Sequence, residues 1–108
     1  MSKSKMTDTE VLTDSAFYIL MSLLEARHGY LIMQYVEATS DGDFVIGPAT
    51  LYTMIKKLLK EEWIELVHEI DRKKIYQITF VGKEKWLQDV KRRKRMVEHA
   101  KIALGGVE

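Results

Sequence analysis

The chain has 108 residues, enough for one domain with a modest hydrophobic core. Its residues are 46% hydrophobic and 31% charged, which excludes a disordered chain, and no apolar run approaches the ~18 residues of a membrane-spanning helix. The sequence has no cysteine, and its first residues lack the apolar segment of a signal peptide, so we expect a cytoplasmic protein without thiol chemistry. The net charge of +1 argues against indiscriminate coating of nucleic acid.

The N-terminal third is predicted to form an arm followed by two helices. Residues 1–12 are polar without a clear period and are expected to be a flexible arm. The first helix is expected to begin at a cap on Thr13 or Asp14 and to end near Glu25, and the second to cover residues 30–39. Five apolar residues of the first helix have the spacing of a core-facing stripe: Ala16, Phe17, Leu20, Leu23 and Leu24. In the second helix, the residues expected to be buried are Tyr30, Met33 and Val36.

The stretch from Gly47 to Lys60 is predicted to form a helix with a sharply defined start. Pro48 suits a first helical position, Gly47 can cap it, and the preceding run 44–46 favours a short β-strand. One face of this helix is apolar, with Leu51, Ile55 and Leu58. The opposite face is small and hydroxylic, then cationic, with Ala49, Thr53, Lys56, Lys57 and Lys60. This order suits a recognition helix that approaches a DNA groove; the alternative is an ordinary amphipathic helix whose lysines are solvated.

A β-hairpin is predicted after this helix. Residues 63–70 alternate between two faces, residues 71–74 form the turn, and residues 75–80 return before Gly82 ends the hairpin. One face of the first strand is expected to hold Ile64, Leu66, His68 and Ile70. Helix, helix, short strand, helix and hairpin are the elements of a winged helix-turn-helix, whose third helix enters the major groove of DNA. We therefore expect a mainly α fold of the α+β class, with this DNA-binding domain over residues 13–82.

A long C-terminal dimerisation helix with a short tail is predicted over residues 83–108, and the pair Gly105-Gly106 is expected to end the helix. Six residues follow the alternating 4-3 spacing of a packed helix pair and predict a homodimer seam: Trp86, Val90, Arg93, Val97, Ala100 and Leu104. Arg93 is a cation within this row, so it should reach solvent, meet an acid or line a cavity. The five consecutive cations at 91–95 wrap more than one turn, so most of them are expected to be solvated.

Five short motifs carry a likeness to a known family: Leu12-Thr13, His28-Gly29-Tyr30, Pro48-Ala49-Thr50-Leu51-Tyr52, Lys57-Leu58 and Arg72-Lys73-Lys74-x-Tyr76-x-Ile78-Thr79-x-x-Gly82. With these motifs the chain resembles the PadR family of bacterial transcriptional repressors, in its small subgroup. The resemblance implies a homodimeric repressor that binds a palindromic operator and dimerises through its C-terminal helix. The chain departs from the family at Thr53, where Pro is frequent, at Glu62, where Gly is frequent, and at Asp71. Relatives commonly carry a Gly-rich insert at this last position, so the shorter wing should reach less far along the DNA backbone.

Candidate DNA contacts are assigned to two elements. On the predicted recognition helix, the groove or its rim is assigned to Ala49, Thr50, Tyr52 and Thr53, and the phosphates to Lys56, Lys57 and Lys60. On the wing, contacts to phosphates or the minor groove are assigned to Arg72, Lys73 and Lys74, the alternative being a solvated turn. Tyr52 has a rival role, because it lies ~100° from Leu51 and would also pack at the edge of the apolar face.

An effector site is a further hypothesis. Some members of the family release DNA on binding phenolic acids or flat aromatic drugs, and the resemblance implies a small aromatic effector here. The alignment with such relatives gives Arg93 in the effector region of the last helix and Trp86 two turns earlier. We therefore expect any pocket at the dimer interface to involve Trp86 and to prefer an anionic ligand near Arg93. The alternative is that Trp86 is a core residue and Arg93 is solvated.

No catalytic or cofactor-binding constellation is visible in the sequence. His28, His68 and His99 lack cysteine partners and the HExxH spacing, which argues against a metal site. The leading hypothesis is an operator-binding repressor, not an enzyme, with double-stranded DNA and a second copy of the chain as partners. The alternative is a winged-helix module for protein–protein contact. A specific duplex footprint with steep salt dependence supports the first, and a neutral heterologous interface without duplex affinity supports the second.

Overall fold

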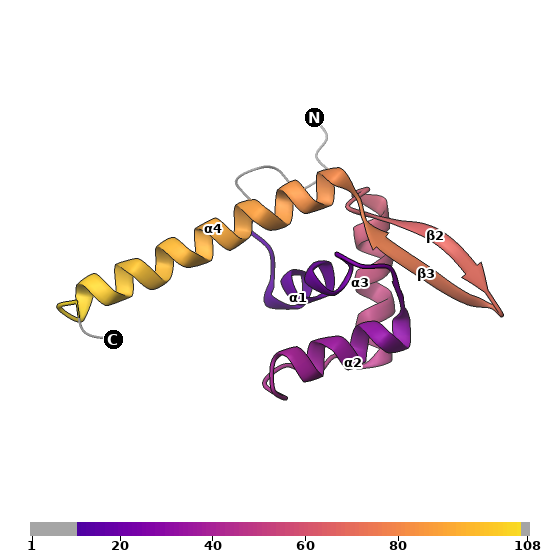
Figure 1. Cartoon of the computed structure of the whole chain (residues 1–108), viewed down its shortest axis with the longest axis horizontal. Coiled ribbons are helices and arrows are strands. Elements are labelled where there is room, and N and C mark those ends of the chain that lie inside the picture. The colour runs from indigo at the N-terminus through magenta and orange to yellow at the C-terminus, as the bar shows by residue number, and fades with distance from the viewer. Residues whose placement is uncertain (1–10, 107–108) are drawn as a thin grey trace.

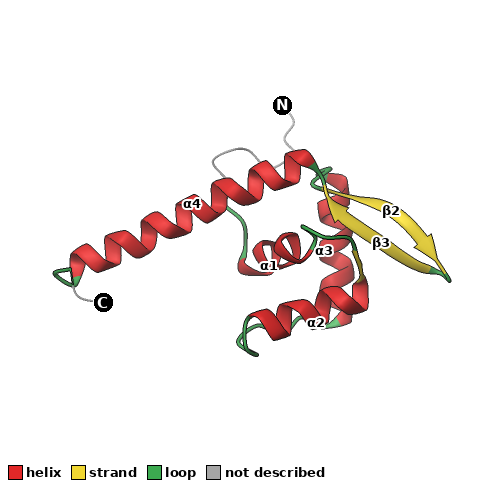
Figure 2. Cartoon of the chain, in the orientation of Figure 1, coloured by secondary structure: helices red, strands yellow, loops and turns green. Residues whose placement is uncertain are grey.

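Four helices and a three-stranded antiparallel sheet make up residues 11–106, the part of the chain that this computed structural model describes. In chain order they are α1 (Asp14–Ser22), β1 (Arg27–His28), α2 (Gly29–Thr39), α3 (Pro48–Lys60), β2 (Ile64–Ile70), β3 (Lys73–Ile78) and α4 (Phe80–Ala103) (Figure 1). The helices α1, α2 and α3 lie together, the β2–β3 hairpin projects to one side of them, and α4 extends to the other (Figure 2). The predicted α+β class and winged-helix order are confirmed, apart from the position of the short strand.

The hydrophobic core is formed by α1, α2, α3 and the start of the hairpin. α1 begins as predicted, because the Thr13 hydroxyl accepts a hydrogen bond from Ala16 N at 3.1 Å. The helix ends at Ser22, three residues earlier than predicted. There the Ser22 hydroxyl donates to the Ile19 carbonyl at 2.7 Å, and the Arg27 guanidinium donates to the Ser22 carbonyl. The Arg27 side chain thus hydrogen-bonds the Ser22 carbonyl, which would otherwise accept from a backbone N–H of a longer helix.

The buried faces of α1 and α2 differ in part from the prediction. Ile32 is fully buried, whereas Leu24 and Tyr30 are exposed, Tyr30 to 60%. In α2 the reason is the phase of the helix. Gly29, Ile32 and Val36 share the inner face, and Tyr30 is turned about 100° away from Gly29. In α1 the helix ends before Leu24, so this residue leaves the stripe. The predicted residues of α1 that are buried are Ala16, Leu20 and Leu23.

The segment 44–46 is a loop and not the predicted strand. Its start is fixed by Ser40, whose hydroxyl accepts from Phe44 N at 3.0 Å and donates to the Val36 carbonyl at 2.8 Å. Ile46 is buried, which explains the apolar character that favoured a strand. The short strand of the fold is instead β1, which pairs antiparallel with β3 through Arg27 opposite Tyr76 and His28 opposite Ile75.

The hairpin of β2 and β3 is the wing of the fold. At its tip Asp71 and Arg72 have φ angles of 51° and 66°, the left-handed values of a two-residue type I′ turn. A bulge between Leu66 and His68 inserts an extra residue into β2. The bulge interrupts the alternation predicted for this strand, and within β2 only Ile64 is buried.

α4 begins at Phe80, three residues before the predicted start, so Gly82 lies inside its first turn rather than at the end of the hairpin. The Thr79 hydroxyl caps the helix by accepting from Gly82 N at 2.9 Å, and it donates to the Glu62 carbonyl at 2.8 Å. A Cβ built on Gly82 would lie 2.0 Å from the Trp63 carbonyl oxygen. The first turn of α4 therefore packs directly on the backbone that leads into the wing.

The two ends of the described chain are fixed differently. Leu12, assigned to the arm by its sequence, is buried, and its N–H donates to the Asp89 carboxylate of α4 at 3.4 Å. Residues 1–10 of the predicted arm lie outside the described residues. At the other end Gly105 and Gly106 have φ angles of 77° and 83°, and they end α4 as predicted.

Candidate nucleic-acid interface

α3 separates its side chains into a buried and an exposed face. Leu51, Ile55 and Leu58 are at most 2% exposed, because they pack into the core between α1 and α2. The residues assigned to DNA from this helix all lie on the surface: Ala49, Thr50, Tyr52, Thr53, Lys56, Lys57 and Lys60. Within the described residues, no ion pair engages any of its three lysines. Their charges are therefore available to an external anion.

The three lysines of α3 do not share one environment. Lys56 and Lys60 are four residues apart and lie in one row of the exposed face. Lys57 lies on the flank toward α1, where it lines a cavity of about 50 Å³ together with Thr13 and the buried Glu61. This position makes Lys57 the weakest of the three candidates for a phosphate contact.

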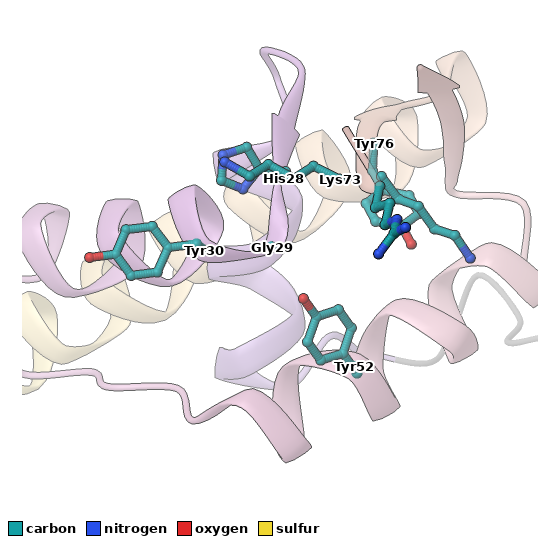
Figure 3. Close-up of a pocket in the computed structure, with 8 residues that line it drawn as sticks. His28, Gly29, Tyr30, Tyr52, Lys73 and Tyr76 are labelled. Atoms are coloured by element: carbon teal, nitrogen blue, oxygen red, sulfur yellow. The ribbon is translucent and has the colours of Figure 1, made fainter. Parts of the chain in front are cut away.

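The wing brings its basic tip toward the start of α2 and toward α3. Arg72, Lys73 and Lys74 are all exposed, and none of them has an ion-pair partner among the described residues. A cavity of about 450 Å³ separates this tip from the helices (Figure 3), and it is lined by His28, Gly29, Tyr30, Tyr52, Arg72, Lys73, Lys74 and Tyr76. Four of the residues assigned to DNA from the sequence thus line one cavity, although they come from α3 and from the wing: Tyr52, Arg72, Lys73 and Lys74.

Tyr52 and Tyr76 stand on opposite sides of this cavity (Figure 3). Tyr52 is 50% exposed and rises from α3 toward Gly29, so it belongs to the cavity wall rather than to the core. Burial raises the pKa of the Tyr76 phenol, and the neighbouring Tyr52 and Glu69 raise it further. Tyr76 is therefore protonated at neutral pH and can act as a hydrogen-bond donor.

Sequence reasoning did not assign His28, Tyr30 and Tyr76 to this surface. His28 and Tyr30 come from the junction of β1 and α2, and Tyr76 comes from the wing strand that pairs with β1. The pairing of Arg27 with Tyr76 brings them together, and β1 was not predicted. The only signal in the sequence was the presence of His28, Tyr30 and Tyr76 in the motifs of the family resemblance.

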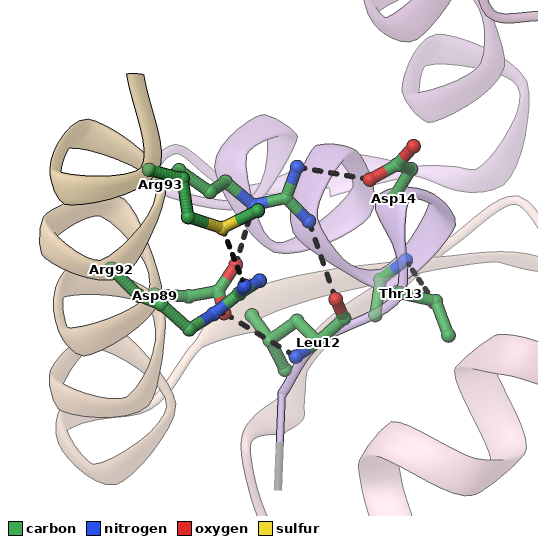
Figure 4. A network of polar contacts seen from close by, with 8 residues as sticks. Leu12, Thr13, Asp14, Asp89, Arg92 and Arg93 are labelled. Carbon is green, nitrogen blue, oxygen red and sulfur yellow. Dashed lines mark hydrogen bonds and ion pairs between the residues drawn. The ribbon is translucent and has the colours of Figure 1, made fainter. Parts of the chain in front are cut away.

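Arg93 is held by an ion-pair network at the junction of α4 with the N-terminal segment (Figure 4). Its guanidinium donates to Asp89 at 2.6 Å, to Asp14 at 2.9 Å and to the Leu12 carbonyl at 3.2 Å. It also lies 4.2 Å from the centre of the Phe17 ring. Two of the three outcomes expected for Arg93 are observed, because it meets acids and also lines a cavity. These acids largely neutralise its charge.

Asp89 is the centre of this network, and its side chain is only 4% exposed. Burial alone would raise the pKa of Asp89, but hydrogen bonds from Arg93, Arg92 and the Leu12 N–H outweigh burial and lower it. The Arg92 guanidinium lies 3.0 Å from the same carboxylate. The pKa of Arg93 is lowered by burial and raised more strongly by Asp89 and Asp14, so it shifts upward overall. Both groups are therefore charged throughout the physiological range, and they join the N-terminal segment to α4.

A second cavity, of about 390 Å³, lies between α1 and α4, and it is lined by Phe17, Val90, Arg93, Lys94, Val97 and Glu98. Trp86 is not part of this wall. It packs on Phe17 with ring centroids 5.7 Å apart, and its indole nitrogen is buried without a hydrogen-bond partner among the described residues. The two residues assigned to an effector are thus separated, with Arg93 in the cavity wall and Trp86 behind Phe17.

The predicted dimer seam falls into two parts. Trp86 and Val90 are half-buried against their own chain. Beyond the Arg93 network α4 leaves the body, and its apolar residues face solvent, Val97 to 55% and Leu104 to 63%. Met96 and Ile102, which the seam did not include, are exposed as well. The second half of α4 therefore presents an apolar surface that no other described element of the chain covers.

Three packed helices, followed by a hairpin with a basic tip beside an exposed basic helix face, define a winged helix-turn-helix protein. Residues 19–88 match the model of the transcriptional regulator PadR-like family. The chain belongs to this family of DNA-binding transcriptional regulators, and the resemblance read from its motifs is confirmed. Within residues 11–106, no helix is long and apolar enough to cross a bilayer, and no three His, Cys, Asp or Glu side chains are grouped to hold a metal.

The chain is similar to an uncharacterised protein X of Lysinibacillus sphaericus, with 34% identity over 95 residues that cover 83% of this chain and 87% of that protein. Among solved structures it is similar to a transcriptional regulator of Clostridium thermocellum, with 26% identity, a TM-score of 0.65 and coverage of 83% and 88% of the two chains. A PadR family regulator of Clostridium difficile shares the fold at 19% identity, with a TM-score of 0.59 and coverage of 84% and 98%.

Proposed function

We propose that the protein is a homodimeric transcriptional repressor that binds a palindromic operator through α3 and the wing. The observation that carries this proposal is the two-faced character of α3. Its apolar face is fully buried, and its other face presents small, hydroxyl and ammonium groups without ion-pair partners among the described residues. A helix of this kind, next to a basic wing tip, matches the contact geometry of a winged helix on B-form DNA.

In this proposal the N-terminal half of the exposed face of α3 enters the major groove. Ala49, Thr50 and Thr53 have short side chains, so they allow the helix backbone to approach the base edges. Lys56 and Lys60 follow along the same face and neutralise phosphates. Arg72 and its two neighbours at the wing tip neutralise phosphates of the flanking backbone.

The dimer is proposed to form along the second half of α4. This segment presents Val97, Ala100 and Leu104 in one exposed row with Met96 beside it, and an exposed apolar row is typical of a protein interface. A two-fold dimer presents two α3 helices, and each then reads one half of a palindrome. The N-terminal part of the predicted seam contributes indirectly, because Trp86 and Val90 pack against their own chain and support α4.

We further propose that a small aromatic acid binding in the α1–α4 cavity lowers affinity for the operator. The cavity of about 390 Å³ is bordered by the Phe17 ring and by Arg93 and Lys94. An aromatic ring would pack beside Phe17, and a carboxylate would meet Lys94 more readily than Arg93, since Arg93 already binds two carboxylates. Titration with small aromatic acids, followed by tryptophan fluorescence and operator binding, tests this proposal. A ligand series that changes neither signal would contradict it.

Selection of bound duplexes from a random pool at fixed salt concentration tests the main proposal. The expected product is a palindrome with half-sites about ten base pairs apart, bound by two chains. Substitution of Lys56 and Lys60 by Ala should then reduce the slope of log affinity against log salt by about one unit for each lost phosphate contact. Lys91→Ala, on the exposed side of α4, is the matched control and should leave the slope unchanged. A pool from which no duplex is enriched would contradict the proposal.

A further inference from the structure

Gly29 and Tyr52 are in unusually close contact. A Cβ built on Gly29 would lie 2.6 Å from the Tyr52 hydroxyl oxygen and 3.1 Å from the ring carbon Cζ. The φ angle of Gly29 lies outside the left-handed region, so the backbone conformation does not require glycine at this position. Its missing side chain instead leaves space for the Tyr52 hydroxyl at the start of α2 (Figure 3).

The Tyr52 ring lines the cavity between α3 and the wing, and its hydroxyl lies at the end of the ring beside Gly29 (Figure 3). On the opposite wall stands the buried Tyr76, whose raised pKa keeps its phenol protonated. The wall also contains the three cations of the wing, Arg72, Lys73 and Lys74. Glu69 is the cross-strand partner of Lys74 and is the carboxylate close to this wall. One acid against three cations leaves the cavity positively charged, and the phenols of Tyr52 and Tyr76 add neutral hydrogen-bond donors.

We propose that this cavity holds one phosphate of the DNA backbone, which the Tyr52 hydroxyl binds as a donor, and that Gly29 is a positioning residue for that hydroxyl. The inference rests on the proposed DNA-binding function and deepens it. The occupant is a backbone phosphate because the cavity lies between α3 and the wing tip, the two elements that flank a bound duplex in this fold. A phosphate bound there ties the recognition helix to the wing, so that both engage one stretch of backbone.

A double-mutant cycle on the selected operator duplex tests this assignment. Tyr52→Phe removes only the donor and should weaken binding roughly tenfold per half-site, equally for specific and nonspecific duplexes, because a phosphate carries no sequence information. Gly29→Ala pushes the hydroxyl away from its position and should weaken binding by a similar factor. The double variant should bind no more weakly than Tyr52→Phe, because phenylalanine lacks the oxygen 2.6 Å from the new methyl group and keeps only the ring carbon at 3.1 Å, at the end of an exposed side chain that can move slightly.

Tyr18→Phe is the matched control for the loss of a phenol. Tyr18 belongs to α1, its ring packs on Phe17 and Phe44 with centroids 5.9 Å and 5.1 Å away, and it does not line the cavity. This variant should bind like the wild type. Urea unfolding of each variant, compared with the wild type, shows whether a loss of binding arises from a loss of folded protein.

Neutral methylphosphonate linkages, placed one at a time in the operator, identify the phosphate itself. One position per half-site should weaken wild-type binding and have no further effect on Tyr52→Phe. Wild-type affinity in the Tyr52→Phe variant would overturn the phosphate contact, and additive losses in the double variant would overturn the positioning role of Gly29. If the wild type binds no duplex at all, the proposed function itself fails, which is a distinguishable result.

Discussion

α3 and the second half of α4 both combine an apolar row with basic residues, but their surroundings differ. In α3 the apolar residues are packed inside their own chain and the lysines face outward. In α4, beyond Arg93, apolar residues such as Val97 and Leu104 face solvent together with the basic ones. Periodicity therefore shows that a helix has an apolar side, but it does not show which chain covers that side. The difference supports the proposal that α3 binds DNA and that the distal part of α4 binds a second copy of the chain.

α4 itself is divided at the Asp89–Arg93 network. Its first half is docked on the body through Gly82 against Trp63 and through Trp86 against Phe17. Its second half extends away from the body (Figure 1). The docked half fixes the direction in which the free half leaves the domain. In the proposed dimer, the spacing of the two α3 helices would consequently depend on contacts within each chain as well as between chains.

The largest effect is expected where α4 is docked most tightly. Gly82→Ala places a Cβ 2.0 Å from the Trp63 carbonyl oxygen, and a backbone atom cannot yield as a flexible side chain does. We expect a loss of about 4 kcal/mol in the free energy of unfolding, measured by urea denaturation. Gly47→Ala is the matched control, because a Cβ there meets nothing within 4 Å. It should cost less than about 1 kcal/mol, and an equal loss in both variants would contradict the docking.

A second pair of variants separates burial within the chain from burial between chains. Leu58→Ala in α3 should lower the free energy of unfolding by about 3 kcal/mol, because it leaves a cavity in the core. Val97→Glu in α4 should instead dissociate the dimer and leave the helical content of each chain nearly intact. Urea denaturation measures the loss of stability in Leu58→Ala, and sedimentation velocity over a range of protein concentrations measures the dissociation of Val97→Glu. A Val97→Glu variant that remains dimeric would remove the distal half of α4 from the interface.

The junction between the two halves of α4 is tested by Asp89→Asn. Asp89 is only 4% exposed, and the neutral amide removes its charge from Arg93 and Arg92, so we expect a loss of about 3 kcal/mol at neutral pH. The pKa of Asp89 is lower in the folded than in the unfolded chain. Its contribution is therefore fully present above the unfolded value of about 4 and is lost as the pH falls through the folded value. Urea midpoints should fall with acidification more steeply for the wild type than for Asp89→Asn, and parallel curves would contradict this role.

The smallest effect on stability is expected on the exposed face of α3. Lys56→Ala removes a solvated ammonium group and should change the free energy of unfolding by less than about 0.5 kcal/mol. Its effect should appear in DNA binding, as a salt slope lowered by about one unit for each lost phosphate contact. Lys57→Ala should lower the slope less, because Lys57 lies on the flank beside Glu61. Equal slopes for Lys56→Ala and the wild type would contradict the assignment of this face.

Local patterns predicted the elements whose signals lie within a few residues. The Gly47-Pro48 start of α3 and the Thr13 cap of α1 were both correct for this reason. The predicted strand at 44–46 was wrong because apolar character there reflects burial of Ile46, whereas the actual strand pairs through residues nearly fifty positions away in sequence. Gly82 was read as a terminator, but its role depends on the approach of the Trp63 backbone.

The candidate site was predictable in its charges and not in its shape. The lysines of α3 and the wing tip were visible as runs of basic residues. Their convergence with Tyr52 and Tyr76 on one cavity depends on the pairing of β1 with β3. The same limit applies to Arg93, whose acidic partner Asp14 lies 79 positions earlier in the chain. Contacts of this kind are set by tertiary packing and leave no periodic signal.

The most direct test of the central claim is cleavage of DNA from α3 itself. The chain contains no cysteine, so Thr53→Cys, on the exposed face of α3, can carry a single DNA-cleaving iron chelate. The account predicts two sets of cuts in the selected operator, symmetric about its centre and about ten base pairs apart. The same label on Thr39→Cys, at the end of α2, should not give this pattern. Absence of cuts from Thr53→Cys, or cuts identical to those from Thr39→Cys, would contradict the account.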